Sequence, residues 1–188
     1  EWYTPKEYIE AARSVLGAID LDPASSLTAN EKVIKAAKFF TLKDNGLVQP
    51  WSGRVWLNPP YAQPFVSDFC DKLVESFGTG AVSAAVVLVN NATETQWFRR
   101  LADLAAVICF PTGRVRFWTP RSDELGAPLQ GQAVIYIGDS PFTFVAAFSA
   151  FGFLMVPSRR HSYGMSVTLS VTILTVLCVV LGSAAVVS

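Results

Sequence analysis

Apolar residues along the chain follow two spacings that alternate. Helical spacing, with apolar positions three or four residues apart, is found at 5–16, 30–40, 64–77 and 94–102. Short runs rich in β-favouring residues are found at 18–26, 55–57, 84–89 and 106–110. The run at 84–89 is apolar throughout, as in a strand that is covered on both faces. Strands that alternate with helices predict one α/β domain built on a mostly parallel, doubly wound sheet.

The last part of this domain predicts a different strand connection. Residues 132–138 and 142–148 have the composition of two strands, and Asp139, Ser140 and Pro141 form a turn between them. Two strands joined by so short a turn run antiparallel. We therefore expect a C-terminal antiparallel hairpin that completes the sheet.

The tail of the chain has a composition of its own. Residues 165–188 contain no charged residue, and Arg159, Arg160 and His161 stand just before them. The length and apolarity are typical of a membrane-spanning helix with a positive flank. The Val-, Thr- and Ser-rich composition leaves open an additional strand pair, or a tail that is out of frame with the domain. The expected organisation is a domain at 1–152, a basic linker at 153–164 and an apolar tail at 165–188.

Composition limits the classes of function. The 188 residues suffice for one domain with a sizeable core, and 15 basic and 15 acidic side chains give a formal net charge of zero. Contact with nucleic acid must therefore come from local clusters of charge. Cys70, Cys109 and Cys178 lie far apart in apolar contexts, which predicts buried thiols in a reducing compartment. A single histidine, His161, cannot build a metal site with them.

The main candidate for chemistry is the stretch Arg54-Val55-Trp56-Leu57-Asn58-Pro59-Pro60-Tyr61. Its first half predicts a buried strand, and the two prolines end that strand in a stiff loop. The side-chain oxygen of Asn58 and the backbone carbonyl of Pro59 can both accept hydrogen bonds from an exocyclic amine. Tyr61 offers an aromatic face to a flat heterocycle. The structural alternative is a Pro-rich turn with a packing tyrosine.

Two other stretches suit a small ligand. The turn from Asp22 to Ser25 follows a predicted strand, and α/β sheets bind ligands beyond the carboxyl ends of their strands. The Gly-x-Gly pattern of nucleotide-binding turns is missing there. Near the N-terminus, Thr4 and Glu7 predict a capping box with Pro5 at the first helical position, and such a helix start suits an anion. The alternatives are a solvated turn and a plain capped helix.

Arginines gather toward the end of the predicted sheet. Residues 99–121 hold five arginines and one acid. Arg114 and Arg116 alternate with Val115 and Phe117, so in a strand both arginines share one face. Arginines interleaved with aromatic residues suit phosphate contacts and base stacking. The alternative is an edge strand with solvated arginines.

The order of these motifs resembles the phage-type DNA N-6-adenine methyltransferase (Dam-like) family. The matching segments are Tyr-Thr-Pro at 3–5, Asp-Leu-Asp-Pro-Ala-Ser at 20–25, Asp-Asn-Gly-Leu at 44–47, Asn-Pro-Pro-Tyr at 58–61 and Gly-Arg-x-x-Phe at 113–117. In that family the Asp-x-Asp-Pro turn replaces the glycine-rich one. The resemblance runs from Trp2 to about Gly152 and implies a Rossmann-like class I methyltransferase fold. The tail is the main departure from the family.

The resemblance implies methyl transfer from S-adenosylmethionine to the N6 amine of an adenine flipped out of DNA, without a metal ion. The implied catalytic residues are Asn58, Pro59, Pro60 and Tyr61. The implied cofactor-binding residues are Tyr3, Thr4, Pro5, Asp22, Ala24, Ser25, Asn30 and Asp44. The implied nucleic-acid-binding residues are Arg114, Arg116 and Phe117. The family also implies a cytoplasmic location in a bacterial host cell, with membrane tethering only if the tail inserts, and a link to DNA restriction and modification.

Other functions stay open at this point. Asn-Pro-Pro-Tyr also serves protein glutamine methyltransferases, and an adenine in RNA presents the same amine as one in DNA. The neutral charge and the tail are compatible with an inactive nucleic-acid-binding remnant. Methylation at N4 of cytosine more often uses Ser-Pro-Pro-Tyr. The motifs do not define the recognition sequence, the preference for single or double strands, or the oligomeric state.

Overall fold

The computed structural model describes residues 3–119, 122–126 and 130–158. The chain divides into two compact units, Glu1–Ser158 and Arg159–Ser188, and all that follows concerns the first. The apolar tail predicted at 165–188 and the third cysteine, Cys178, lie outside the described residues.

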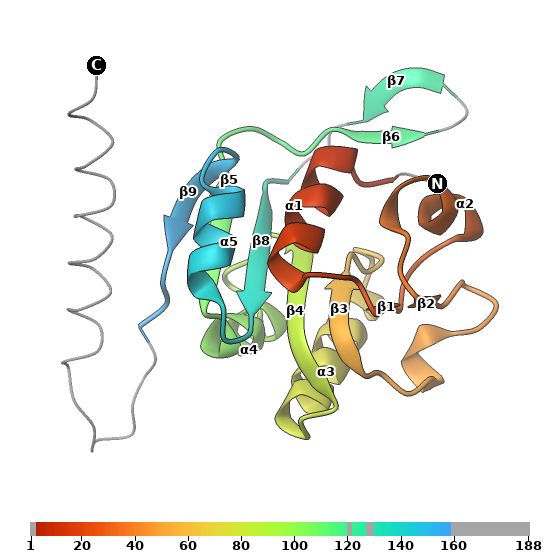
Figure 1. Cartoon of the computed structure of the whole chain (residues 1–188), viewed down its shortest axis with the longest axis horizontal. Coiled ribbons are helices and arrows are strands. Elements are labelled where there is room, and N and C mark those ends of the chain that lie inside the picture. Colours follow the sequence, from red (N-terminus) through yellow and green to blue (C-terminus); the bar gives the residue numbers. More distant parts are fainter. Residues whose placement is uncertain (1–2, 120–121, 127–129, 159–188) are drawn as a thin grey trace. The chain divides into compact units, whose positions relative to one another are not determined.

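The described residues form a seven-stranded sheet, helices on both of its faces, and a separate two-stranded ribbon (Figure 1). The strands of the sheet are β1 (Leu21–Asp22), β2 (Lys38–Phe39), β3 (Gly53–Leu57), β4 (Val82–Asn90), β5 (Val107–Pro111), β8 (Gln132–Ile137) and β9 (Gly152–Met155). The ribbon consists of β6 (Phe117–Thr119) and β7 (Ser122–Gly126). The helices are α1 (Lys6–Leu16), α2 (Leu27–Ala29), α3 (Phe65–Gly78), α4 (Gln96–Leu104) and α5 (Pro141–Phe148), with a π-helical turn η1 (Asn30–Ile34) and a 3-10 turn η2 (Gly46–Val48).

The sheet is mixed rather than mostly parallel. Its strand order is β2-β1-β3-β4-β8-β5-β9. The pairings from β2 to β4 are parallel, whereas β8 runs antiparallel to β4 and β5, and β9 runs antiparallel to β5. Among the described strands, three neighbouring pairs are thus parallel and three antiparallel, which corrects the mostly parallel sheet that the sequence predicts.

The sheet is buried on both faces, as the apolar run at 84–89 predicts. Val86 and Leu88 of β4 belong to the core cluster that contains α1 and α5, whereas Val87 and Val89 belong to the cluster that contains α3 and α4. Figure 1 shows α1 and α5 in front of the sheet, with α3 and α4 behind it. Successive residues of a strand point to opposite faces, so an unbroken apolar run serves both layers. Cys70 and Cys109 are buried free thiols, as expected.

The predicted C-terminal hairpin is wrong. Residues 142–148 lie in α5, where Phe144 stacks on Phe148 at 4.4 Å between ring centroids and on Tyr136 at 5.5 Å. Both edges of β8 are already paired, with β4 and with β5, so a hairpin partner has no edge to occupy. Pro141 at the start of α5 suits a helix, because its fixed φ is helical and its missing N–H has no partner to lose there.

Two other boundaries differ from the sequence-based prediction. The helix expected over 30–40 ends at Ile34, because Lys35 takes a left-handed conformation with φ of 50°. The chain then enters β2, which pairs with β1. The first residues of the predicted linker 153–164 belong to β9, where Phe153 stacks on Phe110 at 5.1 Å.

A pair of alanine substitutions tests whether 142–148 is a helix. Phe144 is fully buried, while Phe142 is 56% exposed. In a strand, both side chains would lie on the same face. We expect Phe144→Ala to lower the free energy of unfolding by about 3–5 kcal/mol, and Phe142→Ala to lower it by less than about 1 kcal/mol. Urea unfolding measures both changes, and equal losses would contradict the helix.

Candidate active site

The ends of β1 and β3 lie side by side, because the two strands are parallel with Leu21 opposite Val55. The ion pair between Asp20 and Arg54 reinforces this register: the Arg54 Nε and Nη2 atoms each donate to a carboxylate oxygen of Asp20 at 2.8 Å. Gly53 permits the approach, because a Cβ at this position would lie 2.7 Å from the Asp20 carboxylate. The turn after β1 and the loop after β3 therefore meet at one edge of the sheet.

A small cavity of about 70 Å³ lies at this edge, and we call it the motif cavity. It is lined by Tyr3, Thr4, Asp22, Ala24, Ser25, Ser26, Ala29, Ile34, Trp56 and Asn58. Six of these residues were predicted as site residues from the sequence: Tyr3, Thr4, Asp22, Ala24, Ser25 and Asn58. The fold thus brings together three sequence motifs, from the N-terminal segment, the turn after β1 and the loop after β3.

Asn58 presents one fixed hydrogen-bond acceptor in this cavity. Its Nδ2 donates to the Oγ1 of Thr4 at 3.0 Å. Its Oδ1 is buried and has no hydrogen-bond partner among the described residues. The indole Nε1 of Trp56, which lines the same cavity, is likewise buried without a partner there. Buried polar atoms are normally paired, so these two atoms mark a place for a polar ligand.

The contact between Thr4 and Asn58 replaces the predicted capping box. α1 begins at Lys6, and Pro5 takes the N-cap position without a side-chain hydrogen bond. Thr4 is buried, with 5% of its surface exposed. Its backbone carbonyl accepts a hydrogen bond from the Nε1 of Trp118 at 3.1 Å. The prediction that Thr4 caps the helix is therefore wrong, because its hydroxyl is engaged in the motif cavity instead.

Tyr3 and Trp118 anchor the N-terminal segment from the other side. Their backbones pair as an antiparallel bridge, with hydrogen bonds of 2.7 and 3.0 Å. Their rings pack at 4.9 Å between centroids. The segment that carries Thr4 is thereby fixed in position before any ligand binds.

Asp22 is a buried carboxyl group on the wall of the motif cavity, with only 1% of its surface exposed. Burial disfavours the charged form and raises the pKa of Asp22 to about 7, although the nearby Ser25 hydroxyl and the hydrogen bond from the Ala24 N–H partly offset this effect. The Ala24 N–H lies 3.1 Å from the Asp22 Oδ1. A cationic or N–H-bearing ligand group would stabilise the carboxylate in this place.

A second, apolar cavity of about 470 Å³ adjoins the first, since Ala24 and Ser25 line both. Its other lining residues are Pro23, Thr41, Leu42, Asn45, Gly46, Leu47, Pro60, Phe65 and Phe69. A Cβ at Gly46 would overlap the backbone carbonyl of Pro23, so only glycine fits there. The Trp51 Nε1 donates to the Gly46 carbonyl at 2.8 Å and fixes this wall. The size lies within the range of about 300–1,000 Å³ that is typical of small-molecule sites.

Tyr61 lines neither the motif cavity nor the apolar cavity. Its ring contacts Phe117 edge-on, at 6.4 Å between centroids. Its hydroxyl is buried without a hydrogen-bond partner in the described part of the chain, and burial raises the pKa of Tyr61. Pro59 is buried, and Pro60 is exposed on the wall of the apolar cavity. Phe117 is itself buried and lines none of the three cavities described here, so it is not presented for its predicted contact with nucleic acid.

Asn30 and Asp44 lie outside both cavities. The Asn30 Oδ1 accepts from the Ala36 N–H at 2.8 Å and closes the loop after η1. The Asp44 carboxylate accepts from the backbone N–H and the hydroxyl of Thr41, at 2.8 and 2.7 Å, and these bonds lower the pKa of Asp44. Both residues shape turns that border the cavities.

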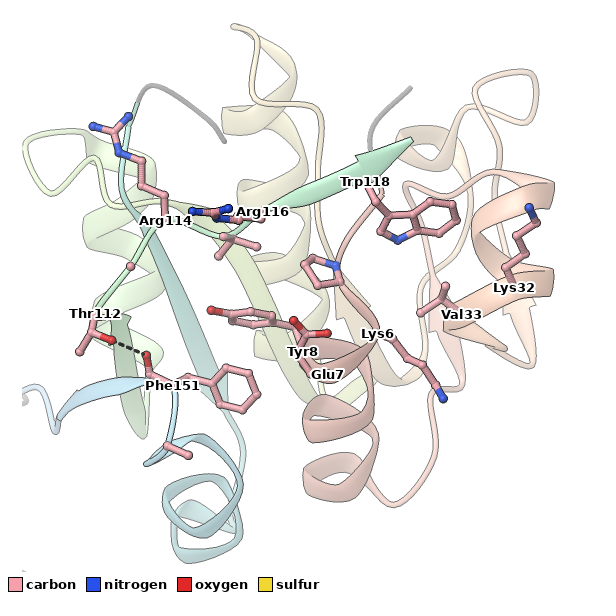
Figure 2. A pocket seen from close by; sticks show the side chains of 14 residues that line it. Lys6, Glu7, Tyr8, Lys32, Val33, Thr112, Arg114, Arg116, Trp118 and Phe151 are labelled. Atoms are coloured by element: carbon pink, nitrogen blue, oxygen red, sulfur yellow. Dashed lines mark hydrogen bonds between the residues drawn. The ribbon is translucent and has the colours of Figure 1, made fainter. Parts of the chain in front are cut away.

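Pro5, Arg114 and Arg116 line a third cavity, of about 800 Å³, which we call the basic cavity (Figure 2). The predicted strand over 114–117 begins only at Phe117, but the alternation it implies is present. Arg114 and Arg116 are exposed, and Val115 and Phe117 are buried.

Sequence reasoning missed two tryptophans. Trp56 precedes Asn58 by two positions and lines the same cavity, and Trp118 follows Arg116 by two positions and lines the basic cavity. In an extended segment, residues two positions apart lie on the same face. This spacing would have predicted Trp56 beside Asn58 and Trp118 beside Arg116.

Within the described part of the chain, no cluster of three or more His, Cys, Asp or Glu side chains is arranged to hold a metal ion. Over the same residues, no helix has both the length and the apolarity needed to cross a membrane.

Comparison with known proteins gives one family. The family model described as DNA N-6-adenine-methyltransferase (Dam) matches residues 1–147, which include all the lining residues of the motif cavity and the apolar cavity. No curated protein matches the chain.

The buried carboxyl group predicts a pH dependence of stability. Because the pKa of Asp22 is raised from 3.8 to about 7, the folded chain binds this proton more tightly than the unfolded chain. The stabilisation is complete below about pH 4 and is lost as the pH rises toward and through 7. Between pH 5 and 8, the free energy of unfolding should therefore fall less for the Asp22→Asn variant than for the unchanged chain. The expected difference is on the order of 2 kcal/mol.

Urea unfolding at the two pH values measures this difference. Asp44→Asn is the matched control, since the lowered pKa of Asp44 gives a contribution of opposite sign, which is lost only as the pH falls. Parallel pH profiles for Asp22→Asn and the unchanged chain would contradict the buried carboxyl group.

Proposed function

The chain belongs to the DNA N-6-adenine-methyltransferase (Dam) family, and from this premise we propose that it moves a methyl group from S-adenosylmethionine to the N6 amine of an adenine flipped out of DNA. The family implies adenine N6 methylation of DNA in general. The proposal adds the donor, the residues and the extrahelical base. The observation that carries it is the buried, unpartnered Oδ1 of Asn58 beside the amide nitrogen that Thr4 engages.

The residues present fit S-adenosylmethionine as the donor. Its ammonium group would find the buried carboxyl group of Asp22 and the Ser25 hydroxyl in the motif cavity. Its flat adenosine part would find apolar walls from Leu47, Phe65 and Phe69 in the adjoining cavity. We assign this binding to Tyr3, Thr4, Asp22, Ala24 and Ser25, with Pro5, Asn30 and Asp44 holding the backbone around them.

S-adenosylmethionine, when bound, would supply an electrophilic methyl group, whose transfer would break the bond between sulfur and the methyl carbon, leave S-adenosylhomocysteine as a neutral thioether and release one proton of the amine to solvent. The adenine amine is a weak nucleophile, because its lone pair is delocalised into the ring. The Asn58 Oδ1 and the Pro59 carbonyl accept its two hydrogens, which favours the tetrahedral geometry and holds the lone pair toward the methyl carbon. The contribution of the protein is thus orientation and a fixed electrostatic environment. Tyr61 supplies the face on which the base stacks.

The oxygen and the nitrogen of an amide side chain are similar in size, but the oxygen accepts hydrogen bonds and the nitrogen donates them. The proposed reaction needs the oxygen to face the substrate amine. The Asn58 Nδ2 donates to Thr4, which leaves the oxygen for the amine. A reversed amide would place two donors against the amine hydrogens. We therefore assign to Thr4 the role of orienting Asn58.

The fold is compatible with this assignment. Since β8 runs antiparallel to both β4 and β5, the strands β1 to β5 point in one direction and end at one edge. We assign this arrangement to the class I methyltransferase type, with β8 as the reversed strand inside the sheet. β9, which runs antiparallel to β5, is a second reversed strand at the edge of the sheet. In a duplex, the N6 amine reaches such an edge only after the base leaves the stack.

Replacement of Asn58 tests the reaction. We expect Asn58→Ala to lower methyl transfer to DNA by at least about 100-fold, as for other preorganised polar groups at a reacting centre, while S-adenosylmethionine still binds. Transfer is measured with labelled S-adenosylmethionine and unmethylated DNA, followed by digestion to nucleosides. Asn91→Ala, at an exposed asparagine just beyond β4, is the matched control and should keep full activity.

The location of the label separates the alternatives. Label in methyladenine from the unchanged chain alone supports the proposal. Label only in RNA or protein would assign another acceptor, and loss of donor binding in the Asn58→Ala variant would give Asn58 a structural role. An unchanged chain that binds neither donor nor DNA would be an inactive member of the family.

Replacement of Thr4 tests the orientation of the amide. Thr4→Val keeps the shape but removes the hydroxyl, and it should lower kcat roughly tenfold with little change in the KM for DNA, the effect of one buried hydrogen bond. Thr4→Ser keeps the hydroxyl and should stay within about threefold of the unchanged enzyme. Equal loss in both variants would show that packing, and not the hydrogen bond, is what matters.

A further inference from the structure

The basic cavity differs from the motif cavity in the residues that line it. Its lining comes from segments far apart in the sequence, at 5–8, 32–33, 112–118 and 150–151. Figure 2 shows Arg114 and Arg116 on one side of this cavity, and Trp118 and Lys32 on the other. The converging side chains define its ligand chemistry.

Most of the charged residues that line this cavity are positive. Lys6, Lys32, Arg114 and Arg116 line it, against a single carboxylate, that of Glu7, an excess of three positive charges over the lining residues. The whole chain has no net charge, so the excess is local. Such a cluster suits the phosphate groups of a nucleic acid.

The loop that carries the arginines is held in place from inside. The Val115 N–H donates to the Oε1 of Gln132 at 3.2 Å, and Gln132 is 3% exposed. The Gln132 Nε2 in turn donates to the Gln130 carbonyl at 2.7 Å. With Val115 anchored inward, both arginine side chains are directed outward before any ligand arrives.

Aromatic side chains complete the lining. Trp118, Tyr8 and Phe151 line the cavity, and Tyr8 packs on Phe151 at 4.5 Å between centroids. The Lys32 Nζ lies 5.8 Å from the centroid of the Trp118 ring. An aromatic surface beside cations is the arrangement with which proteins bind the bases and phosphates of a single strand.

This cavity adjoins the motif cavity through a shared wall. Thr4 lines the motif cavity, and the next residue, Pro5, lines the basic cavity. Trp118 lines the basic cavity, and its Nε1 donates to the Thr4 carbonyl at 3.1 Å. Ligand groups in the two cavities would therefore be neighbours.

We infer that the basic cavity binds the nucleotide adjacent to the target adenine in the same strand, with its phosphate at Arg114 and Arg116 and its base against Trp118. This inference rests on the proposed function and adds a substrate class: DNA that is unpaired at two successive positions. A cavity of about 800 Å³ has the size of a small-molecule site and accepts one nucleotide.

The first test measures binding of the full chain, without donor, to a fluorescent single-stranded oligonucleotide that contains one adenine. Arg114→Ala and Arg116→Ala should each weaken binding roughly tenfold and lower the slope of log K against log salt by about 0.7. Arg99→Ala, at an exposed arginine of α4 outside the cavity, is the matched control and should change neither quantity. An equal effect of all three substitutions would overturn the inference.

The second test leaves the protein unaltered. An abasic position next to the adenine should weaken binding about fivefold or more, the effect of losing one stacked base, whereas an abasic position four nucleotides away should change it little. An iodouracil at the adjacent position should crosslink, on irradiation, to a peptide with Trp118 or Tyr8, as mapped by mass spectrometry. Crosslinks confined to other segments, or equal effects of the two abasic positions, would overturn the inference.

The outcomes separate this inference from the proposed function. Binding and crosslinking need no methyl transfer, so an inactive chain that passes both tests retains the nucleotide site. If the chain methylates DNA but fails both tests, the proposed function stands and the adjacent nucleotide site is ruled out. Tighter binding of a duplex than of the single strand would contradict the substrate class.

Discussion

The hydrogen bond between Asn58 and Thr4 is the contact on which the rest of the site depends. It joins the first residues of the chain to the loop after β3, and it leaves the Asn58 Oδ1 without a partner among the described residues. An N-terminal segment without further contacts could not hold Thr4 in this position. The backbone bridge between Tyr3 and Trp118, and the indole bond to the Thr4 carbonyl, hold it in place. One segment thus orients the candidate catalytic group and separates two cavities.

Low polarity around the motif cavity links Asp22 to Asn58. The environment that raises the pKa of Asp22 to about 7 also strengthens any hydrogen bond formed at the Asn58 Oδ1. Burial of the Asp22 carboxylate and of the Asn58 Oδ1, which has no partner among the described residues, costs free energy because both groups lose hydration. A ligand that satisfies both removes this cost.

Local pattern predicted those parts of the fold that local physics determines. The buried strand before Asn58, the helix near 64–77 and the apolar strand at 84–89 are confirmed as β3, α3 and β4. By composition, residues 142–148 suit a strand or a helix equally. They form a helix because both edges of β8 are paired with other strands, so a hairpin partner has no edge to occupy. Thr4 was misassigned for a similar reason: its partners lie 54 and 114 residues away, beyond any capping pattern.

The positive charges and the candidate reacting groups of this chain line different cavities. The motif cavity contains an amide, a hydroxyl and a carboxyl group that is half-protonated near pH 7, whereas the positive charges line the neighbouring cavity. Contacts with phosphates weaken as the salt concentration rises, because the release of counterions from the nucleic acid then contributes less free energy to binding. A hydrogen bond between buried groups is far less sensitive to salt. In the proposed function, binding of the strand and orientation of the amine therefore respond to different conditions and rest on different residues, although Thr4 and Pro5 are adjacent in the sequence.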